Sequence, residues 1–165
     1  MAQVHLWLIV QCMILLAIAN GTPVIAKKIL GEWLAWPVDG GWLFFDGRPL
    51  LGRSKTFRGV ILAIFGSAVG GYLIGLGAGI GALVGLNAMV GDMLASFFKR
   101  RLGLTPSAEA PGFDQVPESL LPLLTVKNLV GLSVLDILIG VGVFWAGELV
   151  VSRLLYMLRI RDRPY

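Results

Sequence analysis

The stretch that decides the fold is Gly91-Asp92-Met93-Leu94-Ala95-Ser96-Phe97-Phe98-Lys99-Arg100-Arg101. It ends a long apolar segment and carries a carboxylate into a sequence that is otherwise typical of a membrane helix. On a helix, Asp92, Ser96 and Lys99 share one face because they are spaced four and three residues apart. An ionised side chain that faces lipid is costly, so Asp92 is expected to face protein, water or a metal ion.

The composition is that of a membrane protein. The chain has 165 residues, of which 56% are hydrophobic and 15% charged, and its mean hydropathy is +0.81. A soluble domain carries about 25% charged residues. Many of the 22 glycines lie in apolar segments, where small residues let membrane helices pack closely. These features predict an all-α, polytopic membrane protein that forms a single domain over residues 1–165.

Several kinds of site are excluded by residue counts. Cys12 is the only cysteine, so there is no intramolecular disulfide and no thiolate metal cluster. His5 is the only histidine and lies before the first apolar span, so the residue count argues against a histidine-based triad and a multi-histidine metal site. The net charge of +4 is concentrated in basic clusters at 27–58, 99–101 and 153–163. This pattern indicates contact with a membrane surface or with phosphorylated substrates, and not with nucleic acid.

Five apolar segments are candidate spans, at about residues 4–19, 60–76, 80–98, 116–126 and 132–157. The first is expected to be a transmembrane helix and not a cleaved signal peptide, because no Lys or Arg precedes it. Pro23 is expected to break or kink that helix just after Asn20.

The fourth segment decides the topology. Its 11 or so residues reach about 16 Å as a helix, well short of a hydrocarbon core of about 30 Å. If it nevertheless crosses, tilted or extended toward Val130, all three basic clusters lie on the cytoplasmic side, as the positive-inside rule favours. We therefore predict about five transmembrane helices, with the N-terminus outside and the C-terminus inside.

The glycines of the second and third spans recur at four-residue intervals, as in Gly66 and Gly70 or Gly81 and Gly85. This spacing predicts a closely packed helical hairpin, and the same Gly-rich faces are candidates for contact in a homo-oligomer. A phosphate-binding glycine loop is rejected, because no lysine, Ser-Thr pair or soluble strand accompanies these glycines.

The loop between the first two spans combines aromatic and basic residues. Its tryptophans are best explained as an aromatic belt at the membrane interface. Lys55 and Arg58 stand immediately before the second span. Two explanations stay open for them: they follow the positive-inside rule, or they hold phosphate oxygens.

On this topology, acidic and basic side chains converge at one face of the membrane. Two carboxylates with several cations form a suitable site for Mg²⁺ and phosphate groups, because Mg²⁺ favours carboxylate and phosphate oxygens and keeps several waters. The alternative for Asp92 is a structural ion pair. The converging residues are Lys55, Arg58, Asp92, Lys99, Arg100 and Asp114.

The chain resembles the CDP-archaeol synthase family, which is related to the CDP-diacylglycerol synthases. The resemblance covers nearly the whole chain and is carried by the order of its polar blocks. These are Asn20 with Pro23, Asp46-Gly47-Arg48, Lys55-Thr56-Phe57-Arg58-Gly59, Gly91-Asp92 with Ser96 and Lys99-Arg100-Arg101, Asp114-Gln115, and the final Pro164-Tyr165.

The resemblance implies CTP-dependent cytidylyl transfer to a phosphorylated lipid, with release of pyrophosphate and with Mg²⁺ as cofactor. It assigns Asp92 and Asp114 to Mg²⁺. The resemblance also implies a multi-pass protein of the plasma membrane with its active site on the cytoplasmic side, and it leaves open whether the lipid is archaeal ether-linked or bacterial diacyl. The remaining residues fall into three groups: Lys55, Arg58, Lys99 and Arg100 for phosphates, Ser96 for orienting a phosphate or metal-bound water, and Asn20, Asp46, Thr56 and Gln115 for nucleotide contacts.

Two other functions are weighed against this one. A CDP-alcohol phosphotransferase would carry further aspartates after an Asp-Gly pair, and Asp46-Gly47 is followed by no such series. A small transporter or ion-conducting subunit would use Asp92, Asp136 and Glu148 as intramembrane ion-binding residues. Glu148 is the strongest point in favour of the transporter, because cytidylyl transfer gives it no role.

Overall fold

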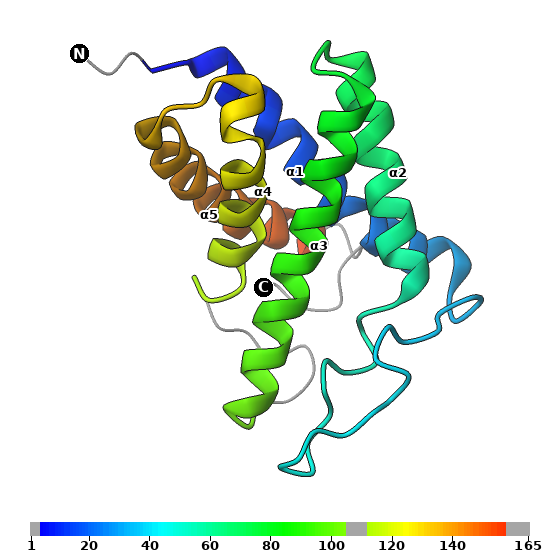
Figure 1. Ribbon diagram of the computed structural model, residues 1–165. Coiled ribbons are helices and arrows are strands. Elements are labelled where there is room, and N and C mark those ends of the chain that lie inside the picture. The colour runs from blue at the N-terminus through cyan, green and yellow to red at the C-terminus, as the bar shows by residue number, and fades with distance from the viewer. Residues whose placement is uncertain (1–3, 105–111, 158–165) are drawn as a thin grey trace.

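The structure is a computed structural model that describes residues 4–104 and 112–157. It contains five α-helices, which confirms the all-α prediction, and within these residues the only β-type pairing is two isolated bridges in the loop before α2. The helices are α1 Leu6–Leu30, α2 Phe57–Leu73, α3 Ala78–Arg101, α4 Gln115–Val130 and α5 Val134–Met157 (Figure 1).

Three helices, α1, α3 and α5, are long and apolar enough to cross a membrane by length and composition. α2 is apolar but has only 17 residues, and α4 has 16. α4 matches the short fourth segment, extended at its end to Val130. The orientation of the two termini stays a prediction, and the C-terminal Pro164-Tyr165 lies outside the described residues.

α1 continues through Pro23 to Leu30, so the predicted break there is wrong, while the alternative of a kink stays a prediction. A proline removes one backbone donor, but the other helical hydrogen bonds remain and membrane helices tolerate this loss. Ala19 and Ala26 on either side of Pro23 are both buried against the bundle. Packing therefore holds the helix together where local sequence predicts an interruption.

The predicted glycine hairpin is confirmed. A Cβ added to Gly81 would lie 2.0 Å from the carbonyl oxygen of Ser67, and one added to Gly71 would lie 2.6 Å from that of Gly77. Only glycine allows α2 and α3 to approach this closely. These glycine faces are thus used inside the chain, and a homo-oligomer would need another surface.

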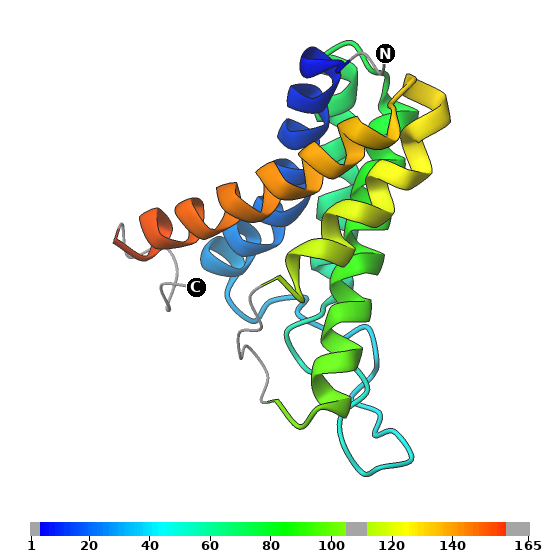
Figure 2. The same ribbon diagram turned by 90° about the vertical axis from the view of Figure 1, so that its left-hand side faces the viewer.

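The core lies where the helices meet. Figure 2 shows α4 running beside α3, while α5 crosses α1. Of the other helices, α5 contacts only α4 and α1. The loop between α1 and α2 lies at the end of the bundle where α3 ends (Figures 1 and 2). The buried side chains of this core come from α1, α2, α3 and α4, and include Leu15, Leu16, Ala63, Val84, Ala88, Leu123 and Val126.

Candidate active site in a charged cavity

An ion pair joins the loop to the third helix. The Nζ of Lys55 donates a hydrogen bond to the Asp92 carboxylate, and both side chains are about four-fifths buried, with 19% and 22% exposed. Lys55 stands just before Thr56, whose hydroxyl caps α2 by accepting a hydrogen bond from the N–H of Gly59 (3.2 Å). The start of α2 is thereby fixed beside Asp92, in the second half of α3.

A glycine brings a second carboxylate to Asp92. A Cβ on Gly91 would lie 2.3 Å from the carbonyl oxygen of Pro117 and 2.8 Å from the Cα of Glu118. Because Gly91 has no side chain, α4 lies directly against α3. This close approach places Asp92 and Glu118 in the wall of the same cavity, which Glu148 of α5 also lines.

These groups line a cavity of about 610 Å³. This volume is in the usual range for small-molecule sites. All five helices and the α1–α2 loop contribute to its walls. Its charged lining residues are Lys27, Glu32, Arg53, Lys55, Arg58, Asp92, Glu118 and Glu148.

The basic residues of the cavity are held by the loop. Arg58 donates hydrogen bonds to the carbonyl oxygens of Trp33 and of Gly31, the latter at 3.0 Å. Burial alone would lower the pKa of Lys55, but the negative charge of Asp92, with Glu118 and Asp114 nearby, raises it above its usual range. Lys55 therefore keeps its positive charge inside the cavity.

Five of the residues predicted from the sequence line this cavity: Asn20, Lys55, Thr56, Arg58 and Asp92. The Nδ2 atom of Asn20 is buried and has no hydrogen-bond partner within the described part of the chain. A buried amide without a partner is costly, so it is available to a bound molecule.

Asp114, which the resemblance assigns to Mg²⁺ together with Asp92, forms an ion pair with Lys99 in the structure, and its role in metal binding stays a prediction. Lys99 Nζ lies 2.7 Å from Asp114 Oδ1, and neither residue lines the cavity. α4 begins at Gln115, and Glu118, one helical turn beyond Asp114, lines the cavity together with Asp92. Gln115 itself accepts a hydrogen bond from the N–H of Gly112 (2.7 Å) and closes the turn before α4.

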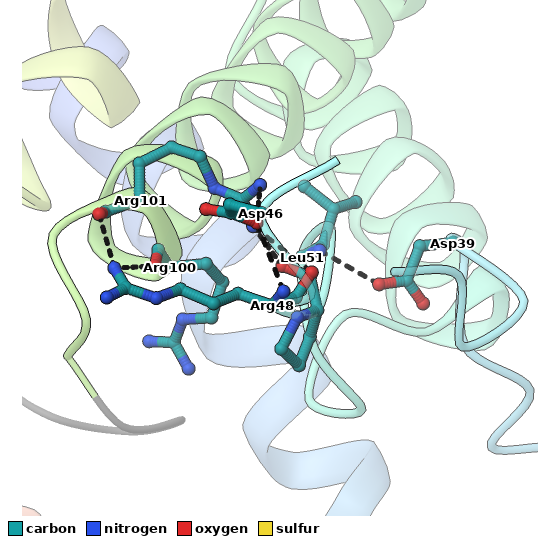
Figure 3. Close-up of polar contacts among 7 residues, drawn as sticks. Asp39, Asp46, Arg48, Leu51, Arg100 and Arg101 are labelled. Atoms are coloured by element: carbon teal, nitrogen blue, oxygen red, sulfur yellow. Dashed lines mark hydrogen bonds and ion pairs between the residues drawn. The ribbon is translucent and has the colours of Figure 1, made fainter. Parts of the chain in front are cut away.

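Ser96, Arg100 and Asp46 are also outside the cavity lining. Ser96 and Arg100 are buried on α3. Asp46 accepts a hydrogen bond from Arg101 (2.9 Å), while Arg48 donates to the carbonyl oxygen of Arg101 (2.6 Å) (Figure 3). These contacts fasten the α1–α2 loop to the end of α3 and give Asp46 a structural role.

Glu118 and Glu148 both line the cavity, and neither was predicted from the sequence to belong to the site. From the sequence, Glu118 is given no role, and Glu148 is considered only for the transporter alternative. The signal was present, because an ionisable residue within a membrane segment is by default a candidate functional residue.

Asp136 does not support an ion pathway. Its carboxylate accepts hydrogen bonds from the backbone N–H of His5 (2.9 Å) and of Ser133 (2.8 Å) and contacts the His5 ring (2.8 Å). Ser133 Oγ in turn accepts from the N–H of Asp136, which is a reciprocal cap at the start of α5. Asp136 therefore ties the beginning of α1 to α5.

Comparison with known proteins agrees with the resemblance. A family model described as CarS-like, CDP-archaeol synthase, matches residues 76–165. The CDP-archaeol synthase of Sulfurisphaera tokodaii is 33% identical over 155 residues, which cover 90% of this chain and 89% of the relative. The CDP-archaeol synthase of Hyperthermus butylicus is 42% identical over 106 residues, and this match covers 59% of each chain.

A solved structure has a similar fold. It is described as an intramembrane enzyme for archaeal membrane lipid biosynthesis. The two superimpose with a TM-score of 0.67 at 28% identity, over 84% of this chain and 91% of the other. With the family model and relatives that match over most of their length, the chain belongs to the CDP-archaeol synthase family.

Proposed function

We propose that the chain transfers a cytidylyl group from CTP to a phosphorylated membrane lipid in the cavity beside Asp92. The products are a CDP-lipid and pyrophosphate. Family membership supports the reaction and disfavours the transporter alternative. The observation that carries the site is the close approach of α3 and α4 at Gly91, which places Asp92 and Glu118 in one cavity with Lys55 and Arg58.

The reaction requires positioning and charge neutralisation more than a protein nucleophile. An oxygen of the lipid phosphate attacks the α-phosphorus of CTP, and the bond to the β-phosphate oxygen breaks as pyrophosphate leaves. Both substrates are anions, so cations must hold them together. Arg53, Lys55 and Arg58 supply those charges from the cavity wall.

Mg²⁺ fits the carboxylates of the cavity. In the described residues no three acidic, histidine or cysteine side chains are grouped closely enough to enclose a metal ion. Mg²⁺ does not need such a cage, since it usually binds through one or two carboxylates together with waters and substrate phosphates. Asp92 and Glu118 would hold the ion, which when bound offsets the charge of the phosphates. Asp114, paired with Lys99, would support the site from outside.

The protein is proposed to lie in the plasma membrane, with its cavity open on the cytoplasmic side. It lies at the end of the bundle where α2 begins and α3 ends. The basic residues of that end favour the inner side by the positive-inside rule. CTP would enter from the water, and the lipid would enter from the bilayer.

The test is cytidylyl transfer by purified protein with Mg²⁺, labelled CTP and a panel of phosphorylated lipids. We expect Asp92→Asn and Glu118→Gln to abolish CDP-lipid formation, and Asp114→Asn to lower it less. Thr125→Val, on the exposed side of α4, serves as the matched control with full turnover. Normal activity of the Asp92→Asn and Glu118→Gln variants would reject the site, and ion flux in vesicles without turnover would reject the function.

A further inference from the structure

The α1–α2 loop has its apolar side chains on the outside. We call residues 33–56 the aromatic loop. The exposed fractions are 70% for Trp36, 75% for Trp42, 65% for Leu43 and 100% for Phe45. Large apolar side chains gathered this densely on a short segment are unusual on a surface that faces water.

One charged side chain of the same loop is buried and organises its backbone. Asp39 is 9% exposed, and its carboxylate accepts hydrogen bonds from the N–H groups of Gly41, Leu51 and Gly52 at 2.9 to 3.0 Å. Arg101, from the end of α3, packs over the ring of Phe44 at 4.5 Å from its centroid. Figure 3 shows Asp39 bound to Leu51, and Arg48 bound to the end of α3. The loop is thus ordered by these contacts, while its large apolar side chains remain exposed.

The depth of the loop matches the membrane interface. Lys55 and Asp92 mark the level at which α2 begins. α2 is about 25 Å long and a hydrocarbon core is about 30 Å thick, so the core reaches a few Å past this level. Phe97, which packs against Phe44 of the loop, lies about 7 Å beyond Asp92 along α3. That position falls in the headgroup layer, which is about 5 to 7 Å thick on each side.

The outer surface of the loop is continuous with the lipid-facing side of α2. The carbonyl oxygen of Trp36 accepts a hydrogen bond from the N–H of Phe57 (3.0 Å), the first residue of α2. Phe57, Ile61 and Phe65 follow at four-residue intervals and are 50%, 63% and 67% exposed. One apolar strip therefore runs from the middle of the membrane onto the loop.

We propose that the aromatic loop is an interfacial anchor: Trp36, Trp42, Leu43 and Phe45 lie in the headgroup–acyl boundary of the lipid bilayer. Tryptophan favours this zone because its ring is amphipathic. The same loop carries Arg53 and Lys55 into the cavity wall. The anchor therefore fixes the depth of that wall, which lies a few Å below the lipid headgroups, whatever lipid is the substrate.

The test uses tryptophan emission from full-length protein in phosphatidylcholine vesicles. In one variant Trp42 is the only tryptophan, the other four being replaced by phenylalanine. In a second, Phe45→Trp is the only tryptophan. Phe65→Trp in the same background is the matched control for a lipid-facing position, and N-acetyltryptophanamide is the control for water. Retained CDP-lipid formation or an unchanged helical circular dichroism spectrum shows that each variant is folded.

We expect emission from both loop positions to shift to shorter wavelength than in water, to be quenched by brominated acyl chains and to be protected from iodide. Quenching by iodide with no effect of brominated lipid at both positions would overturn the proposal and leave this surface to a soluble protein partner. A spin label attached to Phe45→Cys in a Cys12→Ala background measures whether position 45 lies in lipid or in water, with all native tryptophans in place. Its collisions with oxygen should then exceed those with an aqueous nickel chelate, and the reverse order would also overturn the proposal.

Discussion

Replacing Gly91 with alanine tests whether close approach of α3 and α4 builds the site. An alanine at an unobstructed position inside a helix is favoured over glycine by about 0.5–1 kcal/mol. At Gly91 the new Cβ would lie 2.3 Å from the carbonyl oxygen of Pro117, whereas ordinary contacts begin at 3.4 Å. The helices must therefore separate locally by about 1 Å, and overpacking of this kind costs about 1–3 kcal/mol.

The same displacement moves Glu118 away from Asp92. A misplacement of about 1 Å can lower a reaction rate about 100-fold, so we expect turnover to fall more steeply than stability. The measurements are the thermal unfolding midpoint in detergent and the initial rate of CDP-lipid formation. Gly142→Ala is the matched control, because nothing lies within 4 Å of its added Cβ. If Gly91→Ala kept both the wild-type midpoint and the wild-type rate, the proposed role of this contact would be refuted.

Two further predictions concern groups away from the cavity. Burial would raise the pKa of Asp39, but hydrogen bonds from Gly52, Leu51 and Gly41 outweigh it and lower the pKa. The ionised carboxylate therefore stabilises the fold above its unfolded pKa of about 3.9, and this contribution is lost as the pH falls through the lower folded pKa. The difference in unfolding free energy between wild type and Asp39→Asn should shrink from pH 7 to pH 3, and a constant difference would contradict this cause. Asp136→Ala should lower the free energy of unfolding, because the part-buried N–H groups of His5 and Ser133 lose their acceptor, and His5→Ala should lower it less. Equal losses in denaturant unfolding would contradict the proposed link between α1 and α5.

The helices were predictable because they depend on local sequence. Apolar runs bounded by charges gave all five segments, and the glycine spacing gave the α2–α3 hairpin. The error at Pro23 has a clear cause: a missing backbone donor is a local signal, and burial of the neighbouring alanines in the bundle is not visible locally.

The site was predictable only in part, for the same reason. Lys55 and Asp92 were identified because each ends or begins an apolar segment beside other charges. The choice between Asp114 and Glu118 depends on where α4 begins and on how closely it approaches α3. Gly91 sets that approach, because it has no side chain. The sequence alone does not show which segment packs against this glycine.

The charges that line the cavity explain why nucleotide and metal binding should be coupled. Four lining residues are basic and four are acidic, so their formal charges cancel: Lys27, Arg53, Lys55 and Arg58 against Glu32, Asp92, Glu118 and Glu148. A nucleoside triphosphate brings several negative charges into this partly buried space, where uncompensated charge is costly. A divalent cation held by Asp92 and Glu118 would offset that charge, and the nucleotide would in turn offset the charge of the cation. Because such coupling is reciprocal, each should bind more tightly in the presence of the other, and neither is expected to occupy the cavity well alone.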